Sequence, residues 1–499
     1  MKKCFFNSII FVFTILLIFQ SNLVAQNEID NQDLLIKVAE KKVENFARKK
    51  ILKVKNMTFA IKPLIENQNN RNFSWFIATP KNTTDMSTWD LAHHLVKNDE
   101  SVIYAEPDYS RINAYDENGP LNKQEYKDKP KDDCKEDPYT DDWSHPKKIK
   151  VTWHLGKNFS QLKAARIQLE KERKSKEVSI RIAHFDTGYD PSHITTPEKL
   201  RTDLQRNFVD GENKYSAVDP GVEGILKQPG HGTGTISVLA GNKVNRPQNN
   251  FNDYLGSMPF AEIVPVRIAS SVVLYKSSSF VKALYYIMQP DVKCDVLSMS
   301  MGGVASKAWG EAVDRAYING MVIVTASGNN FGKKPTTKVV FPSRFHRVIT
   351  ACGVTYDNTP YFKYGFFSFK MQGNYGPPSV MTSALAAYTP NIVWAKRGCI
   401  DKLMFDPGGT SSATPQIAAA AALWLEKYKD QKYQYPWQRV NAVRHALFSS
   451  AKKNLKNSKK YYGNGVLQTL KALQVKPKLD KKPVQKCKVS FPIWTILFK

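Results

Sequence analysis

The sequence has little of what marks several common protein classes. Its 499 residues include six cysteines, and no two of them have the Cys-x-x-Cys spacing of a zinc site or a thioredoxin-like redox site. The apolar run near the N-terminus, residues 9–19, is shorter than the roughly 20 residues of a membrane-spanning helix, and no later run is long enough. Internal repeats and nucleic-acid-binding motifs are absent too. A globular protein with no membrane span is therefore expected.

Acidic residues are scarce relative to basic ones. There are 72 lysines and arginines against 45 aspartates and glutamates, which gives a formal net charge of +27. Such a field attracts anions, so association with an anionic surface is one expectation. Because the lysines are scattered along the chain, we interpret most of the charge as a solvated surface and expect no specific nucleic-acid partner.

The N-terminus has the pattern of a secretory signal peptide. Lys2 and Lys3 precede the apolar run, and the segment Leu-Val-Ala that ends at Ala25 suits cleavage. A membrane anchor would need a longer apolar core. A lipoprotein anchor would need a cysteine after the run, whereas Cys4 precedes it. We expect secretion, to the extracellular space or the periplasm.

A small region follows the signal peptide. Residues 73–78 and 102–105 have the composition of strands, and residues 89–96 carry apolar side chains on one helical face. Pro107 is expected to end the second strand. The pattern predicts a small α+β domain. Residues 116–149 are charged and rich in proline, which is typical of a linker that proteases can reach.

The longest part of the chain alternates strand-like and helix-like segments. Short apolar strands are predicted at residues 178–183, 263–266, 296–299, 321–324 and 348–351. Between the third and fourth strands, apolar residues from Trp309 to Ala316 have helical spacing. This alternation predicts a parallel sheet covered on both faces, with the functional site at the carboxyl ends of its strands.

The cysteines are predicted to have different roles. Cys294 and Cys352 lie in apolar segments and resemble small core residues. Cys134, Cys399 and Cys487 lie in polar surroundings, and an oxidising compartment would allow one disulfide among them. The sequence does not choose the pair.

Three segments place a reactive side chain beside glycines. Asp186 ends an apolar strand and precedes Thr-Gly; alone, it could be a structural or metal-binding carboxylate. His231 stands in Gly-His-Gly-Thr before an apolar helix; alone, it could be a surface or capping histidine. Ser411 stands in Gly-Gly-Thr-Ser-Ser-Ala-Thr-Pro, before an alanine-rich helix; alone, it could be an ordinary N-cap. Pro415 fits only near a helix start, so Ser411 is expected where the helix dipole favours negative charge.

Taken together, in the order Asp, His, Ser, these segments resemble the subtilisin-like serine proteases. The resemblance covers about residues 178–473. Ala-Ser-Gly-Asn, ending at Asn329, resembles the strand that delivers the oxyanion-hole asparagine of this family. Residues 298–303 resemble the segment that lines its substrate cleft. Tyr-Ala-Glu-Pro-Asp at residues 104–108 resembles, less specifically, the end of its inhibitor-like propeptides.

The resemblance implies a subtilisin-like α/β sandwich with a mainly parallel central sheet flanked by helices, after a small α+β propeptide domain. It also implies a secreted serine endopeptidase that hydrolyses polypeptides through an acyl-enzyme and is inhibited by its own propeptide. The domains would be a signal peptide (1–25), an inhibitor-like propeptide (26–115), a charged linker (116–149), a peptidase domain (150–475) and a basic tail (476–499).

The residue types imply the mechanism. His231 would take the proton of Ser411, and Asp186 would hold the imidazole tautomer. The Asn329 amide and the Ser411 N–H would stabilise the oxyanion.

By resemblance, the pocket for the residue before the scissile bond has two walls and a base. The base is Val340, a branched side chain that would leave a neutral, shortened pocket for small or medium apolar residues. The alternative is that Val340 points into the core. The walls would be Ser300, Met301 and Gly302 on one side and Ala326, Ser327 and Gly328 on the other.

The sequence departs from the family pattern near two members of the expected triad. Residues 234–237 are Gly-Thr-Ile-Ser, where the family usually has His-Val-Ala-Gly, and Ser412 stands where it usually has Met. Neither departure removes a triad member. No cofactor is required for the chemistry. Family members often bind calcium, but residues 242–253 lack an alternating ligand pattern, so structural calcium stays open.

Two other functions are compatible with the same residues. One is a maturation protease that cuts a single partner protein, and the other is a catalytically silent, surface-binding member of the family.

Overall fold

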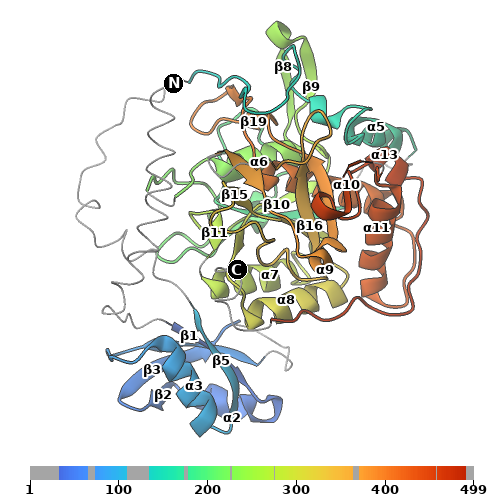
Figure 1. Ribbon diagram of the computed structural model, residues 1–499. Coiled ribbons are helices and arrows are strands. Elements are labelled where there is room, and N and C mark those ends of the chain that lie inside the picture. The colour runs from blue at the N-terminus through green and yellow to red at the C-terminus, as the bar shows by residue number, and fades with distance from the viewer. Residues whose placement is uncertain are drawn as a thin grey trace. The chain divides into compact units, whose positions relative to one another are not determined.

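The computed structural model describes residues 33–65, 74–108, 134–172, 178–224, 227–274, 276–362, 370–453, 455–456 and 458–489. The chain divides into two compact units (Figure 1). The first comprises residues 1–127 with 275–285 and 306–309, and the second comprises the rest of the chain. The predicted signal peptide lies outside the described residues, as do residues 116–133 of the predicted linker and 490–499 of the tail.

The first unit contains a five-stranded antiparallel sheet in the order β2-β3-β4-β1-β5. Apolar side chains of the sheet pack with those of α2 and α3 into one core. The start of α3 is capped by the Ser87 hydroxyl, which accepts a hydrogen bond from the Asp90 N–H at 3.1 Å. The elements are β1 (Asp33–Val38), η2 (Glu40–Lys42), α2 (Val43–Arg48), β2 (Ile51–Val54), β3 (Met57–Pro63), β4 (Trp75–Pro80), α3 (Thr88–Asn98) and β5 (Val102–Asp108).

The strand, helix and strand predicted for this unit are present as β4, α3 and β5. The prediction that Pro107 ends its strand is wrong, because β5 continues to Asp108 and Pro107 pairs with Leu34 of β1. β5 lies at the edge of the sheet and pairs on one side only. An edge strand accommodates a residue that has no N–H to donate.

Two buried carboxylates at the end of β5 bind helix starts within the first unit. Glu106 accepts hydrogen bonds from the Ser306 hydroxyl at 2.7 Å and from the next two backbone N–H groups at 3.0 and 3.1 Å. Asp108 accepts one from the Ser278 N–H at 2.9 Å. These positions are the starts of α7 and α8. The first N–H groups of a helix have no partner within the helix, and the positive end of its dipole lies there, so a carboxylate is favoured at both positions. Burial raises the pKa of both carboxyl groups.

The second unit is built on a seven-stranded sheet in the order β18-β16-β14-β12-β6-β10-β7. Every neighbouring pair in this sheet is parallel. The five predicted strands are β6, β10, β12, β14 and β16, so the predicted fold class is confirmed. The sheet comprises β6 (Arg181–Asp186), β7 (Arg206–Asn207), β10 (Glu262–Arg267), β12 (Val296–Met299), β14 (Val322–Ala326), β16 (Ile349–Val354) and β18 (Ala384–Tyr388).

Helices flank the sheet (Figure 1). The alanine-rich α10 packs against β12, β14, β16 and β18, and its five consecutive alanines, residues 418–422, are wholly buried. Helices α7 and α8 begin in the first unit and end in the second. The longer helices are α5 (Leu162–Glu172), α6 (His231–Ala240), α7 (Ser277–Ile287), α8 (Lys307–Ile318), α10 (Thr410–Lys427) and α11 (Pro436–Ser450).

Short elements complete the second unit. In the parts of the chain that are described, no helix has the length and apolar character to cross a membrane. The short helices are η3 (Trp153–Leu155), η4 (Thr202–Leu204), η5 (Pro247–Asn249), α9 (Pro378–Met381), α12 (Ser458–Tyr461) and α13 (Thr469–Ala472). The short strands are β8 (Lys243–Arg246), β9 (Phe251–Tyr254), β11 (Val273–Leu274), β13 (Gly302–Gly303), β15 (Asn329–Phe331), β17 (Met371–Gly373), β19 (Trp394–Ala395) and β20 (Leu403–Met404).

Residues 134–149, the described part of the predicted linker, are anchored to the second unit. A disulfide joins Cys134 to Cys399, so the structure selects one pair among the three cysteines that the sequence left open. The Thr140 N–H donates to Asn391 Oδ1 at 3.1 Å, and the Asn391 amide donates back to the Thr140 carbonyl at 3.3 Å. This segment is therefore part of the second unit. As predicted, Cys294 and Cys352 are buried free thiols, and Cys487 is free as well.

His154 in η3 is a wholly buried histidine with an unusual environment. Neither of its ring nitrogens has a hydrogen-bond partner among the residues that the structure describes. Burial lowers its pKa from 6.5 to about 3, because no partner offsets the loss of water around the charged form. Between these two values the unfolded chain binds a proton that the folded chain does not. The free energy of unfolding therefore falls as the pH decreases through this range.

We expect His154→Leu to make stability less sensitive to acid. A single such group changes the free energy of unfolding by about 1.4 kcal/mol per pH unit. Between about pH 6 and pH 4, the pH dependence of the free energy of unfolding should therefore be smaller in the variant by up to this amount. Urea unfolding followed by tryptophan fluorescence at several pH values measures this slope. The control is His445→Gln, a change at a partly buried histidine. Equal slopes for wild type and His154→Leu would contradict the prediction.

Candidate active site

Asp186 is the last residue of β6, and its side chain is wholly buried. Its Oδ1 accepts hydrogen bonds from His231 Nδ1 at 2.6 Å and from the Thr187 N–H at 2.8 Å. Its Oδ2 accepts one from the Thr235 hydroxyl at 3.0 Å. Burial alone would raise the pKa of this carboxyl group. The charge and hydrogen bond of His231, with smaller contributions from His184 and Thr187, outweigh burial and hold the pKa below its usual value.

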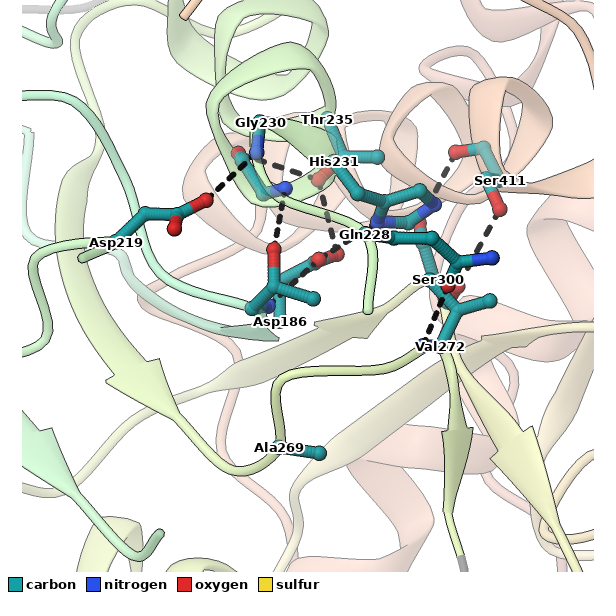
Figure 2. A network of polar contacts seen from close by, with 12 residues as sticks. Asp186, Asp219, Gln228, Gly230, His231, Thr235, Ala269, Val272, Ser300 and Ser411 are labelled. Carbon is teal, nitrogen blue, oxygen red and sulfur yellow. Dashed lines mark hydrogen bonds and ion pairs between the residues drawn. The ribbon is translucent and has the colours of Figure 1, made fainter. Parts of the chain in front are cut away.

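His231 is the first residue of α6, as predicted, and β6 and α6 together position it beside Asp186. The close approach depends on Gly232, because a Cβ at that position would overlap the carbonyl oxygen of Gly188. The His231 side chain is 13% exposed, so solvent and ligands reach the ring. Figure 2 shows the imidazole between Asp186 and Ser411, with the nitrogen that does not bind Asp186 on the side of Ser411.

Ser411 is the second residue of α10, as the sequence indicated. Pro415 has no N–H, so the Ser411 carbonyl four residues earlier lacks its usual helical partner. The Ser300 hydroxyl donates to that carbonyl at 3.0 Å, and the Ser411 hydroxyl donates to the Ser300 carbonyl at 3.3 Å. The neighbouring Ser412 is oriented differently, since its hydroxyl donates to the Gly408 carbonyl at 3.3 Å. Figure 2 shows the Ser411 side chain beside the His231 ring.

The Asn329 side chain is fixed at the start of α10. Its Oδ1 accepts a hydrogen bond from the Thr410 N–H at 2.9 Å. A backbone N–H can only donate, so the amide nitrogen is at the other end of the group. Gly409 makes room for it: a Cβ at that position would lie 2.9 Å from Asn329 Nδ2, and its φ of +77° also favours glycine. The amide N–H groups are therefore oriented beside the N-terminus of α10.

The residues predicted to form the walls of a pocket differ in exposure. Gly302 and Gly328 are partly exposed, whereas Met301 is buried. The Ser327 hydroxyl is turned toward the Asn374 carbonyl, to which it donates at 3.0 Å. Ser300 and Ala326, the other predicted wall residues, are buried as well.

Val340 lies between the two walls. Its N–H donates to the Ser327 carbonyl at 3.0 Å, and the next residue's carbonyl accepts from the Gly303 N–H at 2.8 Å. Its methyl groups face both glycines: a Cβ at Gly328 would lie 3.0 Å from each of them, and a Cβ at Gly302 would overlap one. Val340 is partly exposed, and it is the preceding Val339 that packs in a core cluster.

Gly234 and Ser412, at two of the departures from the family pattern, both lie against Trp394, a residue that the sequence did not indicate. Trp394 lies against α6 at Gly234, where any Cβ would overlap the indole ring. Its Nε1–H donates to the Ser412 hydroxyl at 3.1 Å. Its ring also meets the His231 ring edge to face, with centroids 5.3 Å apart. A small residue at 234 and a hydroxyl at 412 are the sequence signals that could have indicated a large hydrogen-bonding neighbour.

Metal-ligand clusters are not found in the described residues: no group of three or more His, Cys, Asp or Glu side chains could hold an ion there. The segment in which calcium was left open forms the strands β8 and β9. Asp253 in this segment forms ion pairs with two side chains, with Lys163 Nζ at 2.6 Å and with Arg166 at 3.0 Å.

Comparisons with known proteins identify the family of the chain. The family model described as the Subtilase family matches residues 177–465, which include Asp186, His231, Asn329 and Ser411. Subtilisin DY of Bacillus licheniformis is 28% identical over 303 residues, covering 60% of this chain and 92% of that protein. Subtilisin E of Bacillus subtilis (strain 168) is 28% identical over 318 residues, covering 63% and 70%. The major intracellular serine protease of the same strain is 26% identical over 266 residues, covering 51% and 71%.

The contact between Gly234 and Trp394 gives a prediction of unusual sign. Alanine is normally about 1 kcal/mol better than glycine inside a helix. Here we expect Gly234→Ala to lower the free energy of unfolding by about 1–3 kcal/mol, because the added methyl overpacks the site against the indole. Urea unfolding followed by circular dichroism measures the change. In a Trp394→Leu background the same substitution should be neutral or stabilising, and an equal loss in both backgrounds would contradict the proposed clash.

Proposed function

The chain belongs to the subtilase family as a subtilisin-like serine endopeptidase, and from this premise we propose that Asp186, His231 and Ser411 are its catalytic triad. The observation that carries the proposal is the arrangement of these three residues. A buried carboxylate binds one nitrogen of an imidazole, and the other nitrogen faces a hydroxyl at a helix start. This is the arrangement that activates a serine, whose hydroxyl is a weak nucleophile by itself.

In the proposed reaction, Ser411 Oγ attacks the carbonyl carbon of the scissile bond while its proton passes to His231. The imidazolium gives that proton to the leaving amine, and the acyl-enzyme forms. Water then attacks the ester with His231 again as the base, which releases the acid product and restores Ser411. Asp186 holds the Nδ1–H tautomer and stabilises the imidazolium.

Two donors would stabilise the oxyanion. They are the amide N–H of Asn329, whose oxygen end is held by the Thr410 N–H, and the backbone N–H of Ser411 in the first turn of α10. A donor of this kind contributes roughly 3–4 kcal/mol to transition-state stabilisation. The dipole of α10 acts in the same direction.

We further propose that Val340 forms the base of the pocket for the residue before the scissile bond. The two backbone hydrogen bonds around it and the closeness of its methyl groups to Gly302 and Gly328 support this role. A valine there leaves space for Ala, Val or Leu, and less for Phe, Tyr or Lys.

The chain is also proposed to be made as a secreted precursor. Residues 26–115 would act as an intramolecular inhibitor, and residues 1–25 as the signal peptide. The anchoring of residues 134–149 limits where the precursor can be cut. A cut after Cys134 would leave the propeptide attached through the disulfide to Cys399, so we place it between Asp108 and Cys134.

The compartment and the partners follow from the same features. The disulfide supports an oxidising compartment, outside the cell or in the periplasm. Intracellular serine proteases also match the chain, so similarity alone does not decide the compartment. The proposal of secretion rests on the signal-like N-terminus and the disulfide. Polypeptides are the proposed substrates, and the net charge of +27 supports association with anionic surfaces.

The triad is tested by substituting the two adjacent serines. Ser411→Ala should abolish casein hydrolysis and labelling by a fluorophosphonate, and it should accumulate as the longer, uncut chain. Ser412→Ala is the matched control and should retain most activity, because its hydroxyl binds Gly408 and Trp394 instead of facing His231. Activity in Ser411→Ala would refute the triad. Equal processing of both variants would show that another protease removes the propeptide. A mature N-terminus beyond Cys134 would contradict the proposed position of the cut.

The pocket is tested with matched peptides that end in Ala, Leu, Phe or Lys. Wild type should have the higher kcat/KM for Ala and Leu, and Val340→Gly should raise the value for Phe by about 10-fold, since one methylene is worth about 1–3 kcal/mol in such a pocket. Val339→Ala is the control, because Val339 packs in the core and should affect stability only. A wild-type preference for Phe or Lys would disprove the role of Val340.

A further inference from the structure

We infer that Thr235 and His184 are positioning residues that extend the triad inward through Asp186. His184 donates from Nε2 to the Thr235 hydroxyl, which in turn donates to the oxygen of Asp186 that His231 does not bind. The inference rests on the proposed function, because it assigns to these residues an effect on the step in which His231 acts as a base.

The geometry follows from the two elements that hold Asp186 and His231. His184 and Asp186 are two residues apart on β6, so their side chains are on the same face of the strand. His231 and Thr235 are four residues apart on α6, so they are on the same face of the helix. Where the two faces meet, Thr235 contacts both His184 and the oxygen of Asp186 that His231 does not bind. Figure 2 shows Thr235 and His231 both pointing toward Asp186.

The distances support a continuous chain of hydrogen bonds. His184 Nε2 is 2.8 Å from Thr235 Oγ1, and Thr235 Oγ1 is 3.0 Å from Asp186 Oδ2. His184 Nε2 itself is 3.8 Å from that oxygen, too far for a direct bond. All three side chains are buried, so water does not compete for these groups.

The direction of this series of hydrogen bonds depends on one proton, that of the Thr235 hydroxyl. The Thr235 hydroxyl has a single hydrogen, which could go to Asp186 or to the Gly232 carbonyl 3.3 Å away. It could also go to His184, if Nε2 were the bare nitrogen of that ring. A carboxylate is the stronger acceptor and is also closer than the Gly232 carbonyl. An Nε2–H on His184 removes the remaining alternative and directs the hydroxyl proton to Asp186.

The surroundings of His184 agree with a neutral ring. Burial is the largest influence, and together with His231 it lowers the pKa of His184 to about 4 despite the nearby Asp186. His184 therefore carries one ring proton near neutral pH. On the neighbouring strand β10, Arg267 pairs in register with Asp186, but its guanidinium binds Glu212 and the Thr187 carbonyl. Across from His184 on the two neighbouring strands are the uncharged Pro265 and Ser298.

The consequence for the reaction is a carboxylate that cannot turn. With Oδ1 bound by His231 and Thr187 and Oδ2 bound by Thr235, rotation about the last side-chain bond of Asp186 would break a hydrogen bond to a charged group. The donor from Thr235 also withdraws electron density from the carboxylate. Without it, Asp186 would be a stronger acceptor and would favour the protonated form of His231.

The experiment measures kcat, KM and the pH profile of the full-length protein after self-processing, on a chromogenic peptide that ends in Leu. Thr235→Val keeps the shape and removes the hydroxyl. It should lower kcat by about 10-fold, the order expected for one hydrogen bond to a charged group, with little change in KM. The acid limb of kcat/KM should move to higher pH. Thr235→Ser, which keeps the hydroxyl, should restore both values.

A double-mutant cycle separates positioning from a general effect on packing. His184→Leu should reduce kcat, and His184→Gln, which keeps an N–H at similar reach, should largely restore it. In the Thr235→Val background, His184→Leu should cause no further loss, because His184 acts through Thr235. Full multiplication of the two losses would overturn the inference, as would an unchanged kcat and pH profile in Thr235→Val.

A measurement without substitutions in the chain of hydrogen bonds covers the case in which these variants fail to fold. In Ser411→Ala labelled with 15N-histidine, the nitrogen shifts of His184 should be those of the Nε2–H tautomer. The Nδ1–H tautomer would overturn the inference. Loss of the proposed function itself would appear differently, as wild-type activity that is absent or insensitive to Ser411→Ala.

Discussion

The hydrogen bond between Asp186 and His231 joins the end of β6 to the start of α6, and the second unit is arranged around it. A buried carboxylate is costly unless it is paired and hydrogen-bonded. Here the chain provides donors to both oxygens of Asp186 and excludes water, so the orientation of the carboxylate is fixed. Gly232 allows the helix to approach the strand closely enough for that bond. The parallel sheet then places the carboxyl ends of β12 and β14, which lead to Ser300 and Asn329, at the same edge as Asp186.

Much of this arrangement could be predicted from the sequence because strong local patterns specify it. Short apolar strands, an alanine-rich helix and glycines beside Asp186, His231 and Ser411 are visible without a structure. The edge strands β7 and β18 were not predicted, since β7 has only two residues and β18 consists largely of alanine. Pro107 was misinterpreted because its effect depends on whether its strand lies at an edge, and a sequence does not show strand order. Thr235 and His184 were missed because their pairing arises only when β6 and α6 pack together.

Trp394 illustrates how several departures from a family pattern can form one structural solution. At 234 a glycine stands where the family usually has histidine, and at 412 a serine stands where it usually has methionine. Together they leave a space and a hydroxyl that a single indole occupies and binds. The indole also meets the His231 ring edge to face, so its packing limits how far the imidazole can move. Trp394 thus supports the site although it is not one of the reacting groups.

The disulfide between Cys134 and Cys399 joins two positions that are 265 residues apart in the sequence and closes the chain between them into a covalent ring. Asp186, His231 and Asn329 lie inside this ring, and Ser411 follows it closely. A protease is surrounded by other copies of itself, and exposed loops are the first places to be nicked. A single nick within the ring leaves the two pieces joined through sulfur, and they separate only on reduction. The ring therefore gives the enzyme a tolerance to its own activity that packing alone would not provide.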